Sequence, residues 1–352
     1  MRVILQALSL APDLWTPPAF ELREGLQGFA DEGLDEIIAL VPASAAEKAP
    51  QGLAVHAIPP PSTALAGLAF EFHGAARLAA SLGGDVLYSL EESAPWSSPI
   101  PVVATAEFPR PARQGLGSRF EAALRRASLG GAAAMLQAED LPQRTDIRRV
   151  QHVPPLVSGR FHPAGPEDAS SRSDDYVLAW VEGRLGLKRV LAAWSWVDAS
   201  LGDSVRLRLL CPTAIWAETA RREAEGLGIG ESVECVGFDE EPDVAGIHRR
   251  ARVLLHAGDV STPQIFRWAL ASGVPLAAES SAVAAAVAGT AAYLVPPSDT
   301  RALGAAVLTL LVEESVAGAL RERGLERAQA YGTRRGVGRR LELLGLIAAG
   351  AT

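Results

Sequence analysis

Short apolar runs alternate with longer segments of helical character along the first part of the chain. The run EIIALV, residues 36–41, is apolar and β-branched at its centre, as in strands that are buried on both faces. Strands are predicted over Arg2–Ala7, Glu36–Val41, Val55–Ile58, Asp85–Leu90, Val102–Thr105, Ala132–Gln137 and Arg148–Val153. Helices are predicted over Phe20–Asp31, Leu65–Leu82 and Ser118–Ser128. This alternation predicts a parallel sheet with helices on both of its faces.

A polar stretch, PAGPEDASSRSDD, interrupts the pattern at residues 163–175, and the alternation then restarts. The later strands are predicted over Tyr176–Trp180, Arg206–Cys211, Ser232–Val236, Val253–His256 and Pro275–Ala278. The later helices are predicted over Lys188–Leu201, Ile215–Leu227, Asp243–Arg250, Pro263–Ala271 and from Thr300 to about Leu344. The pattern therefore predicts two Rossmann-like domains, residues 1–158 and 159–335. A C-terminal helix over 336–352 could pack back on the N-terminal domain.

Composition narrows the class of protein. The chain has 352 residues, of which 48% are hydrophobic and 21% charged, as in folded globular proteins. Its net charge of -8 argues against a general nucleic-acid binder. The N-terminus lacks the pattern of a signal peptide, and no stretch approaches the roughly 18 apolar residues of a membrane span. We therefore expect a cytoplasmic protein. The two cysteines form no disulfide framework, and the six histidines are too scattered to predict a metal site.

Several spaced motifs occur in one order along the second half of the chain. The segment from Pro275 to Asp299, PLAAESSAVAAAVAGTAAYLVPPSD, predicts a strand, an Ala-rich segment, a second strand and a turn. Before it stand YVLAWVEGRLGLKRVLAAW and VECVGFDEEPDVAGIHRRARVLLHA, and after it LRERGLERAQAYGTRRGVGRRLELL. Together, over roughly residues 153–344, they resemble the retaining glycosyltransferases of family 4. The resemblance implies a GT-B fold, in which two Rossmann-like parallel-sheet domains face a central cleft. It also implies metal-independent transfer from an NDP-sugar donor, with no cofactor.

Two cations stand where a strand gives way to a helix. Arg184 and Lys188 would lie at the carboxyl end of the sheet, where an Arg fork and a Lys point charge suit an anionic diphosphate. The resemblance implies that this pair holds the donor diphosphate. The alternative is two solvated cations beside a turn. The resemblance also implies donor contacts from the residues Gly183, Phe238, Thr262 and Gln264.

The loop before the helix at Pro263 is ambiguous. The family has a Gly-rich phosphate cradle there, but Pro263 has no N–H to donate. An ordinary helix capped by Ser261 or Thr262 explains the same residues. In the first domain, Ala106-Glu107 replaces a His-Asp pair of the family. Glu107 could contact the acceptor hydroxyl, but an exposed acid at the end of a strand is the commoner case. The segment LSLAPDLWTPPAF replaces the Gly-Gly loop of the family.

The chain departs from the family at two carboxylates. Val260 and Trp268 occupy the positions of the paired glutamates that are implied to support the donor sugar and its ribose. Neither side chain can accept a hydrogen bond as a carboxylate does. Asp259 lies next to the first position and could act there as a catalytic group after a local shift; the alternative is a solvated turn residue.

Two classes of function remain open. One is a glycosyltransferase with altered donor recognition, acting on an unknown acceptor that is a glycan, a lipid or a small molecule. The other is a catalytically degenerate homologue that acts as a binding or scaffold partner. The residues Arg334, Arg335, Arg339 and Arg340 could contact a membrane surface or a protein partner, although a solvated helix face is more common.

Overall fold

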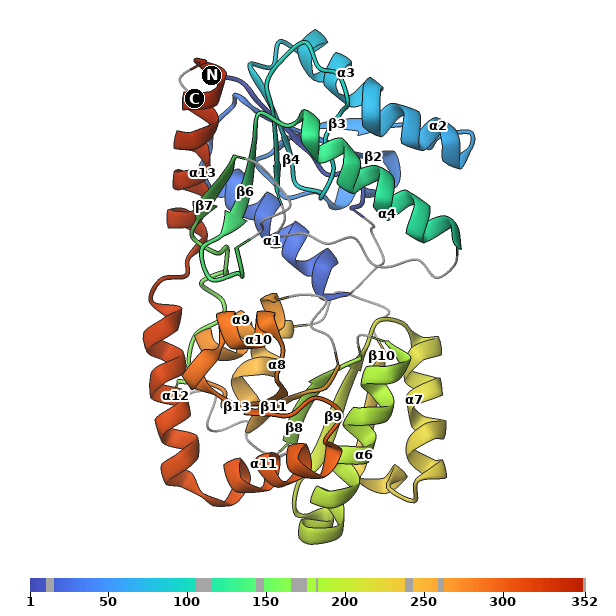
Figure 1. Cartoon of the computed structure of the whole chain (residues 1–352), viewed down its shortest axis with the longest axis vertical. Coiled ribbons are helices and arrows are strands. Elements are labelled where there is room, and N and C mark those ends of the chain that lie inside the picture. Colours follow the sequence, from blue (N-terminus) through green and yellow to red (C-terminus); the bar gives the residue numbers. More distant parts are fainter. Residues whose placement is uncertain are drawn as a thin grey trace. The chain divides into compact units, whose positions relative to one another are not determined.

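The chain folds into two compact units in a computed structural model (Figure 1). The structure describes residues 1–10, 16–105, 116–143, 149–165, 176–181, 183–237, 243–258 and 263–350. Unit 1 comprises Met1–Pro12, Pro17–Ser158 and Gly332–Thr352, and unit 2 comprises Asp13–Thr16 and Gly159–Tyr331. Element labels follow Figure 1.

Unit 1 contains a seven-stranded sheet, within the described ranges, with the order β3-β2-β1-β4-β5-β6-β7. All its neighbouring strands pair in parallel. The strands are β1 (Val3–Gln6), β2 (Ile37–Pro42), β3 (Ala54–Ile58), β4 (Val86–Ser89), β5 (Val102–Thr105), β6 (Ala134–Ala138) and β7 (Val150–Val153). Strand β1 is central, because Val3 pairs with Ile37 on one side and with Val86 on the other.

One face of this sheet is covered by the helices α1 (Pro17–Asp31) and α13 (Thr333–Ala348) (Figure 1). The C-terminal helix is fixed there by Arg340, which is fully buried and donates to the carbonyl oxygen of Pro154 at 2.8 Å. The expectation of one solvated basic face is therefore wrong at Arg340: its side chain anchors the helix. The other three arginines of the run are exposed.

The opposite face carries α2 (Ala64–Ala69), α3 (Ala75–Ser81) and α4 (Leu116–Ser128). The sequence predicts one continuous helix over Leu65–Leu82. The structure instead places a π-helical turn, Phe70–Gly74, between α2 and α3. The spacing of apolar residues does not reveal such a turn, because a single wider turn changes the helical period over only a few residues.

Unit 2 contains a six-stranded sheet, among the described residues, with the order β10-β9-β8-β11-β12-β13 and parallel pairing throughout. The strands are β8 (Tyr176–Trp180), β9 (Arg206–Cys211), β10 (Val233–Gly237), β11 (Val253–His256), β12 (Leu276–Glu279) and β13 (Ala292–Val295). The two parallel sheets with helices on both faces confirm the predicted α/β class.

The helices of unit 2 also form two layers. The helices α6 (Arg184–Leu201), α7 (Ala214–Gly226) and α11 (Thr300–Val312) share one core with the sheet. On the other face, aromatic contacts join the sheet to α8 (Val244–Arg250) and α9 (Gln264–Ala271). The short helix α10 (Ala282–Val287) and the long helix α12 (Glu314–Ala328) complete the unit.

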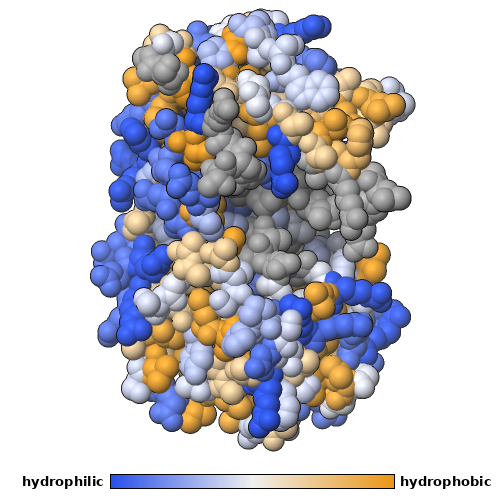
Figure 2. All heavy atoms as spheres, viewed as in Figure 1, coloured by the Kyte–Doolittle hydropathy of each residue, from blue (hydrophilic) through white to orange (hydrophobic). Residues whose placement is uncertain are grey.

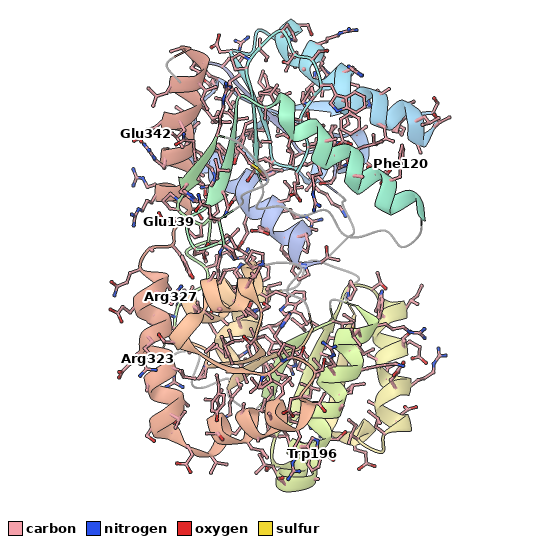
Figure 3. All side chains as sticks on the ribbon, in the orientation of Figure 1. Phe120, Glu139, Trp196, Arg323, Arg327 and Glu342 are labelled. Atoms are coloured by element: carbon pink, nitrogen blue, oxygen red, sulfur yellow. The ribbon has the colours of Figure 1, made fainter. Side chains whose placement is uncertain are left out.

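Helix α12 contacts the segment between β12 and β13. Arg327 donates from Nε to the carbonyl oxygen of Val287 at 2.8 Å, and Arg323 donates to that of Thr290 at 3.2 Å. Figure 3 shows both side chains on α12. A cation is favourable at the C-terminal end of a helix, so these contacts cap α10 and fix the approach to β13.

Within the described ranges, no single helix combines the length and the apolar character that crossing a membrane requires. Taken together, α11 and the α12–α13 stretch meet those criteria by length and composition, but they are bent by 95° at their junction.

Candidate functional site

The site in unit 2 lies where the order of its strands reverses. Strand β8 has β9 on one side and β11 on the other, so the connections after β8 and β11 leave toward opposite faces of the sheet. Ligands of open α/β sheets bind at the carboxyl ends of strands at such a point. Here that position is formed by the first turn of α6, after β8, and by Ala257 and Gly258, after β11.

Glycines allow these two segments to approach each other closely. A Cβ atom at Gly186, in the first turn of α6, would lie 3.0 Å from the carbonyl oxygen of Ala257. Gly258 has φ +95°, and a Cβ there would lie 3.5 Å from the Cα of Gly186. Gly183 precedes the helix with φ +149°. Such positive angles favour glycine, so the backbone at this point requires the residues that the sequence supplies.

Helix α6 begins at Arg184, four residues before the predicted start at Lys188. Buried Leu187, Val190 and Leu191 extend its apolar stripe to the N-terminus. Among the described residues no side chain caps the helix, so its first N–H groups remain available there, and they form the positive end of the helix dipole.

The predicted pair of cations occupies this helix end. Arg184 and Lys188 are exposed, and their spacing of four residues places them on one face of α6. No ion pair or side-chain hydrogen bond involves either of them in the part of the chain that the structure describes. Two unpaired cations beside uncapped N–H groups are an arrangement that binds anions.

Glu279 at the end of β12 connects the parts of this site. Its side chain is 2% exposed and accepts three hydrogen bonds. The donors are Arg189 Nη1 at 2.9 Å, the N–H of Gly258 at 2.9 Å and the N–H of Ser298 at 3.0 Å. The carboxylate thus ties α6 to the segments that follow β11 and β13. Sequence reasoning missed it; the available signal was an acid at the end of the apolar strand PLAAE.

Trp268 lies in an aromatic cluster that we define as Phe161, Trp180, His248 and Trp268. The ring of Trp268 is fully buried and stacks on Phe161 at 5.1 Å, and it meets the edge of His248 at 5.7 Å. The position of the implied second glutamate is therefore part of the core of unit 2. A nucleotide ribose would find no carboxylate at this residue.

His248 is neutral in this cluster. Its Nδ1 lies 2.9 Å from the carbonyl oxygen of Val244, so this nitrogen carries the proton. Burial lowers the pKa of His248 to about 4, because an imidazolium would lose its hydration there.

Gln264 does not line an open loop. It is the first residue of α9, is fully buried, and accepts a hydrogen bond from Arg267 Nη1 at 3.3 Å. The N-cap residue is Pro263, with no side-chain cap. The predicted cap Ser261 lies outside the described residues, so its capping stays a prediction. Phe238, Asp259, Val260 and Thr262 lie outside the described residues, as does Glu107. Their proposed roles remain predictions.

The described residues contain no group of three or more His, Cys, Asp or Glu side chains placed to hold a metal ion. Both cysteines are free, and burial raises the pKa of Cys211 to about 12 and that of Cys235 to about 11. Neither thiol is poised for nucleophilic chemistry.

Unit 1 has its own reversal of strand order, between β1 and β4, and buried polar side chains gather there. Gln6 and Ser89, which end these strands, are fully buried. Among the described residues, neither the amide oxygen nor the amide nitrogen of Gln6 has a hydrogen-bond partner. Sequence reasoning missed this residue, whose signal was a lone polar group at the end of an apolar strand.

Comparison with known proteins identifies the fold. No protein-family model and no curated protein sequence matches the chain. Solved structures do match it over nearly its full length. WaaG, a glycosyltransferase involved in lipopolysaccharide biosynthesis, is 14% identical with a TM-score of 0.73, covering 97% of this chain and 99% of WaaG.

Two further structures agree. HepE of Anabaena, solved with UDP and glucose, is 13% identical with a TM-score of 0.71, covering 98% of this chain and 99% of HepE. Sucrose-phosphate synthase of Thermosynechococcus elongatus is 15% identical with a TM-score of 0.73, covering both chains completely. The chain therefore has the GT-B glycosyltransferase fold, as the sequence motifs predicted.

Proposed function

We propose that the protein transfers a sugar from a nucleoside-diphosphate sugar to an acceptor hydroxyl, with retention of configuration and without a metal ion. The observation that carries this proposal is the pair Arg184 and Lys188, exposed and unpaired within the described chain, at the uncapped start of α6. The structure of HepE with UDP-glucose supports the choice of donor class by fold analogy.

The two cations supply the charge that this reaction needs. The bond between the anomeric carbon and the diphosphate oxygen breaks, and the acceptor oxygen forms its bond on the same face of the sugar. The acceptor proton passes to an oxygen of the leaving phosphate. Arg184 and Lys188 stabilise the negative charge that develops on the diphosphate, and the helix dipole adds to their effect.

In this scheme Glu279 affects the reaction indirectly, by fixing the positions of neighbouring groups. It holds Gly258 and Arg189 in place, so the start of α6 keeps a fixed position relative to the segment after β11. It is a positioning residue, because all three of its described hydrogen bonds are to groups of the protein. Asp259, next to Gly258 in the chain, remains the predicted acid for the reacting face of the sugar.

Calorimetry and thermal unfolding with UDP, GDP, ADP and their glucose conjugates test the proposal. A nucleotide at about 100 times its dissociation constant should stabilise the protein by about 2.7 kcal/mol. Replacing both cations, Arg184→Ala with Lys188→Ala, removes two charge-assisted contacts. This should weaken binding by at least about 100-fold, since each contact contributes about 1.5–3 kcal/mol.

The chain offers a matched control for this double variant. Arg334 and Arg335 are also exposed cations in the first turn of a long helix, but they belong to unit 1. Replacing both with Ala changes the net charge equally and should leave nucleotide affinity within about twofold. If none of the nucleotides binds, the transferase proposal fails and a non-catalytic binding protein becomes the better account. Equal losses in both double variants would remove Arg184 and Lys188 from the site.

A further inference from the structure

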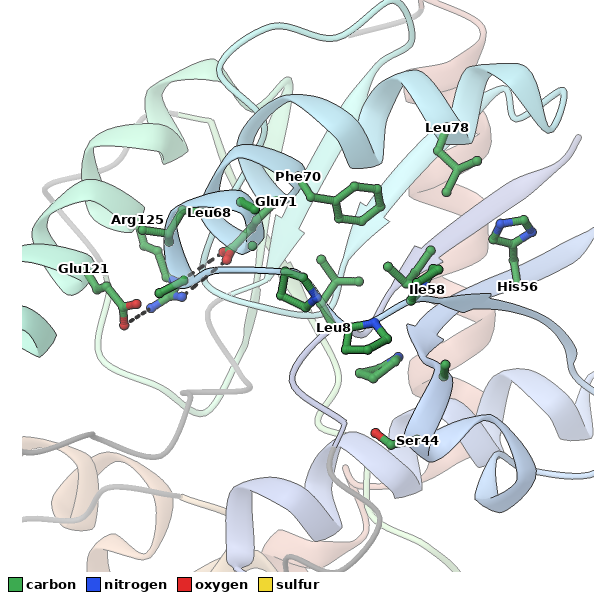
Figure 4. Close-up of a pocket in the computed structure, with 18 residues that line it drawn as sticks. Leu8, Ser44, His56, Ile58, Leu68, Phe70, Glu71, Leu78, Glu121 and Arg125 are labelled. Atoms are coloured by element: carbon green, nitrogen blue, oxygen red, sulfur yellow. Dashed lines mark hydrogen bonds and ion pairs between the residues drawn. The ribbon is translucent and has the colours of Figure 1, made fainter.

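A large pocket opens in unit 1 at the carboxyl ends of β1, β2 and β3 (Figure 4). Its volume is about 520 Å³, within the range of small-molecule sites. Leu8 follows β1, Pro42 ends β2 and Ile58 ends β3, and all three line the pocket. The carboxyl ends of parallel strands are where α/β folds bind ligands, so the pocket has the position of a site.

The walls of this pocket are mainly apolar; besides the charged groups at one end, its polar side chains are Ser44 and His56. Three consecutive prolines, Pro59–Pro61, form one wall, and a proline has no N–H to donate. Leu68, Phe70 and Leu78 add apolar side chains. A bare sugar needs a hydrogen-bond partner for most of its hydroxyls, and Ser44 and His56 can serve only some of them. The lining is therefore suited to an apolar body.

Helix α2 leaves the pocket open because three of its four lining residues are small; the fourth is Leu68. Ala64, Ala66 and Gly67 line the pocket, whereas Leu65 on the same helix points away and is 78% exposed. Figure 2 shows apolar side chains gathered over α2 on the molecular surface. The π-helical turn that follows directs both Phe70 and Glu71 to the pocket. Such turns occur often at functional sites.

One end of the pocket is charged but has no free cation among the described residues. Arg125 donates to Glu71 through Nε at 3.0 Å and Nη2 at 3.3 Å, and to Glu121 through Nη1 at 3.4 Å (Figure 4). Burial lowers the pKa of Arg125, but the hydrogen bonds and charges of Glu71 and Glu121 outweigh that effect and raise it. One guanidinium and two carboxylates leave a net charge of -1 at this end. An anionic head group would be repelled there.

We propose that this pocket binds the apolar body of a neutral acceptor, an uncharged alcohol or phenol whose hydroxyl receives the sugar. The acceptor is thus neither a free glycan nor a lipid phosphate. The inference rests on the proposed transfer reaction and specifies its acceptor. Since burial of one methylene contributes about 0.8 kcal/mol, affinity should rise about fourfold per methylene of the acceptor.

Displacement of 1-N-phenylnaphthylamine, an uncharged fluorophore that brightens in apolar pockets, tests the proposal on the full chain. Octyl β-glucoside below its micellar concentration should displace the dye, and methyl β-glucoside should not. Octyl phosphate has the same alkyl chain and a negative charge, so it should need about ten times the concentration. If octyl phosphate displaces the dye as well as octyl β-glucoside does, the acceptor need not be uncharged and the proposal fails. If methyl β-glucoside does so, the pocket does not select an apolar body and the proposal fails as well.

Two substitutions on α2 test whether the dye binds in this pocket. Ala66→Phe fills the pocket and should weaken dye binding at least tenfold, whereas Ala69→Phe, the same change on the same helix outside the pocket, should not. Ala64→Phe at an exposed lining position is a second filling variant, should Ala66→Phe fail to fold. Unchanged dye affinity in both filling variants would overturn the proposal.

Nucleotide binding separates this proposal from the previous one. Ala66→Phe should bind the nucleoside diphosphate as the unaltered chain does, because the cations on α6 belong to unit 2. Loss of dye binding with retained nucleotide binding supports the acceptor pocket. A chain that binds the dye at this pocket but no nucleotide would contradict the transfer reaction and leave the pocket as a site of another kind.

Discussion

The cations of the two units stand in opposite environments. In unit 1, Arg125 is 17% exposed at its side chain and is paired with two glutamates. In unit 2, Arg184 and Lys188 are exposed and have no partner within the described chain. A paired and partly buried cation contributes to stability and has little remaining attraction for an anion. Exposed, unpaired cations contribute little to stability and remain available for a ligand.

This contrast assigns different chemistry to the two sites. In the two proposals above, anion binding belongs to the start of α6, and the pocket beside Arg125 is left to an uncharged molecule. Such a division would suit a transferase that joins a charged donor to a neutral acceptor, because a free cation in the acceptor pocket would compete for the donor diphosphate. The contrast can be tested by measuring stability and binding separately at each cation.

The largest effect is expected from Arg125→Met. The substitution keeps an unbranched side chain but leaves Glu71, whose side chain is 5% exposed, without its guanidinium. Removal of one partner of a buried ion pair costs about 3 kcal/mol or more. Urea unfolding should show this loss in the free energy of unfolding. The neighbouring exposed Arg126→Met is the control and should change it by less than about 0.5 kcal/mol. Similar effects in both variants would contradict the structural role of Arg125.

A somewhat smaller effect is expected at Glu279, where unit 2 has a paired cation of its own. Glu279→Gln removes the charge that balances Arg189 and turns an NH2 group toward at least one of three donors. We expect a loss of about 2–3 kcal/mol in the free energy of unfolding. The exposed Glu322→Gln on α12 should have almost no effect. If Glu279 positions the donor site, nucleotide affinity should fall as well, measured where the variant is fully folded. Unchanged affinity would limit Glu279 to a structural role.

Much of the fold followed from the sequence because hydrophobic burial is local in a parallel sheet. Strands such as Val102–Thr105 and Tyr176–Trp180 are buried on both faces. Their apolar runs predicted the bounds that the structure confirms. The start of α6 and the π turn at Phe70–Gly74 were not predicted. Both depend on backbone geometry, the positive φ of Gly183 and a widened helical turn, which residue periodicity does not encode.

The residues of the candidate site could be predicted only where they lie close together in the sequence. Gly183, Arg184 and Lys188 lie within one short segment, so a motif could indicate them together. Glu279 acts on Arg189, which is 90 residues away in sequence. The neutralisation of Arg125 by Glu71 depends on a contact over 54 residues. Such pairings arise from the topology of the sheet, and one sequence does not show them.

His248 extends the comparison to a basic group that is buried without a carboxylate partner among the described residues. Its pKa is lowered to about 4 in the folded protein, against about 6.5 when unfolded. The unfolded state therefore binds more protons between these values, and stability falls as the pH falls through that window. From pH 7 to pH 5 we expect a loss of about 2 kcal/mol from this residue.

His248→Phe should keep the aromatic packing and abolish that part of the pH dependence, so the variant should lose about 2 kcal/mol less between pH 7 and pH 5. The exposed His152→Phe serves as the control and should follow the unaltered protein. Unfolding by urea at each pH measures both. Identical pH profiles for His248→Phe and the unaltered chain would mean that the pKa of His248 is the same in the folded and unfolded states.

The smallest effect, and the one with opposite sign, is expected from replacing Arg184 and Lys188 with Ala. Arg184 lies in the first turn of α6, where the positive end of the helix dipole disfavours a cation. Ala also has the higher helix propensity. The double variant should therefore be as stable as the unaltered chain or more stable by about 0.5 kcal/mol, as measured by urea unfolding. A loss above about 1 kcal/mol would show that these cations hold α6 in place, as Arg125 holds its helix in unit 1. A gain in stability together with lost nucleotide affinity is the result expected of residues whose role is to bind a ligand.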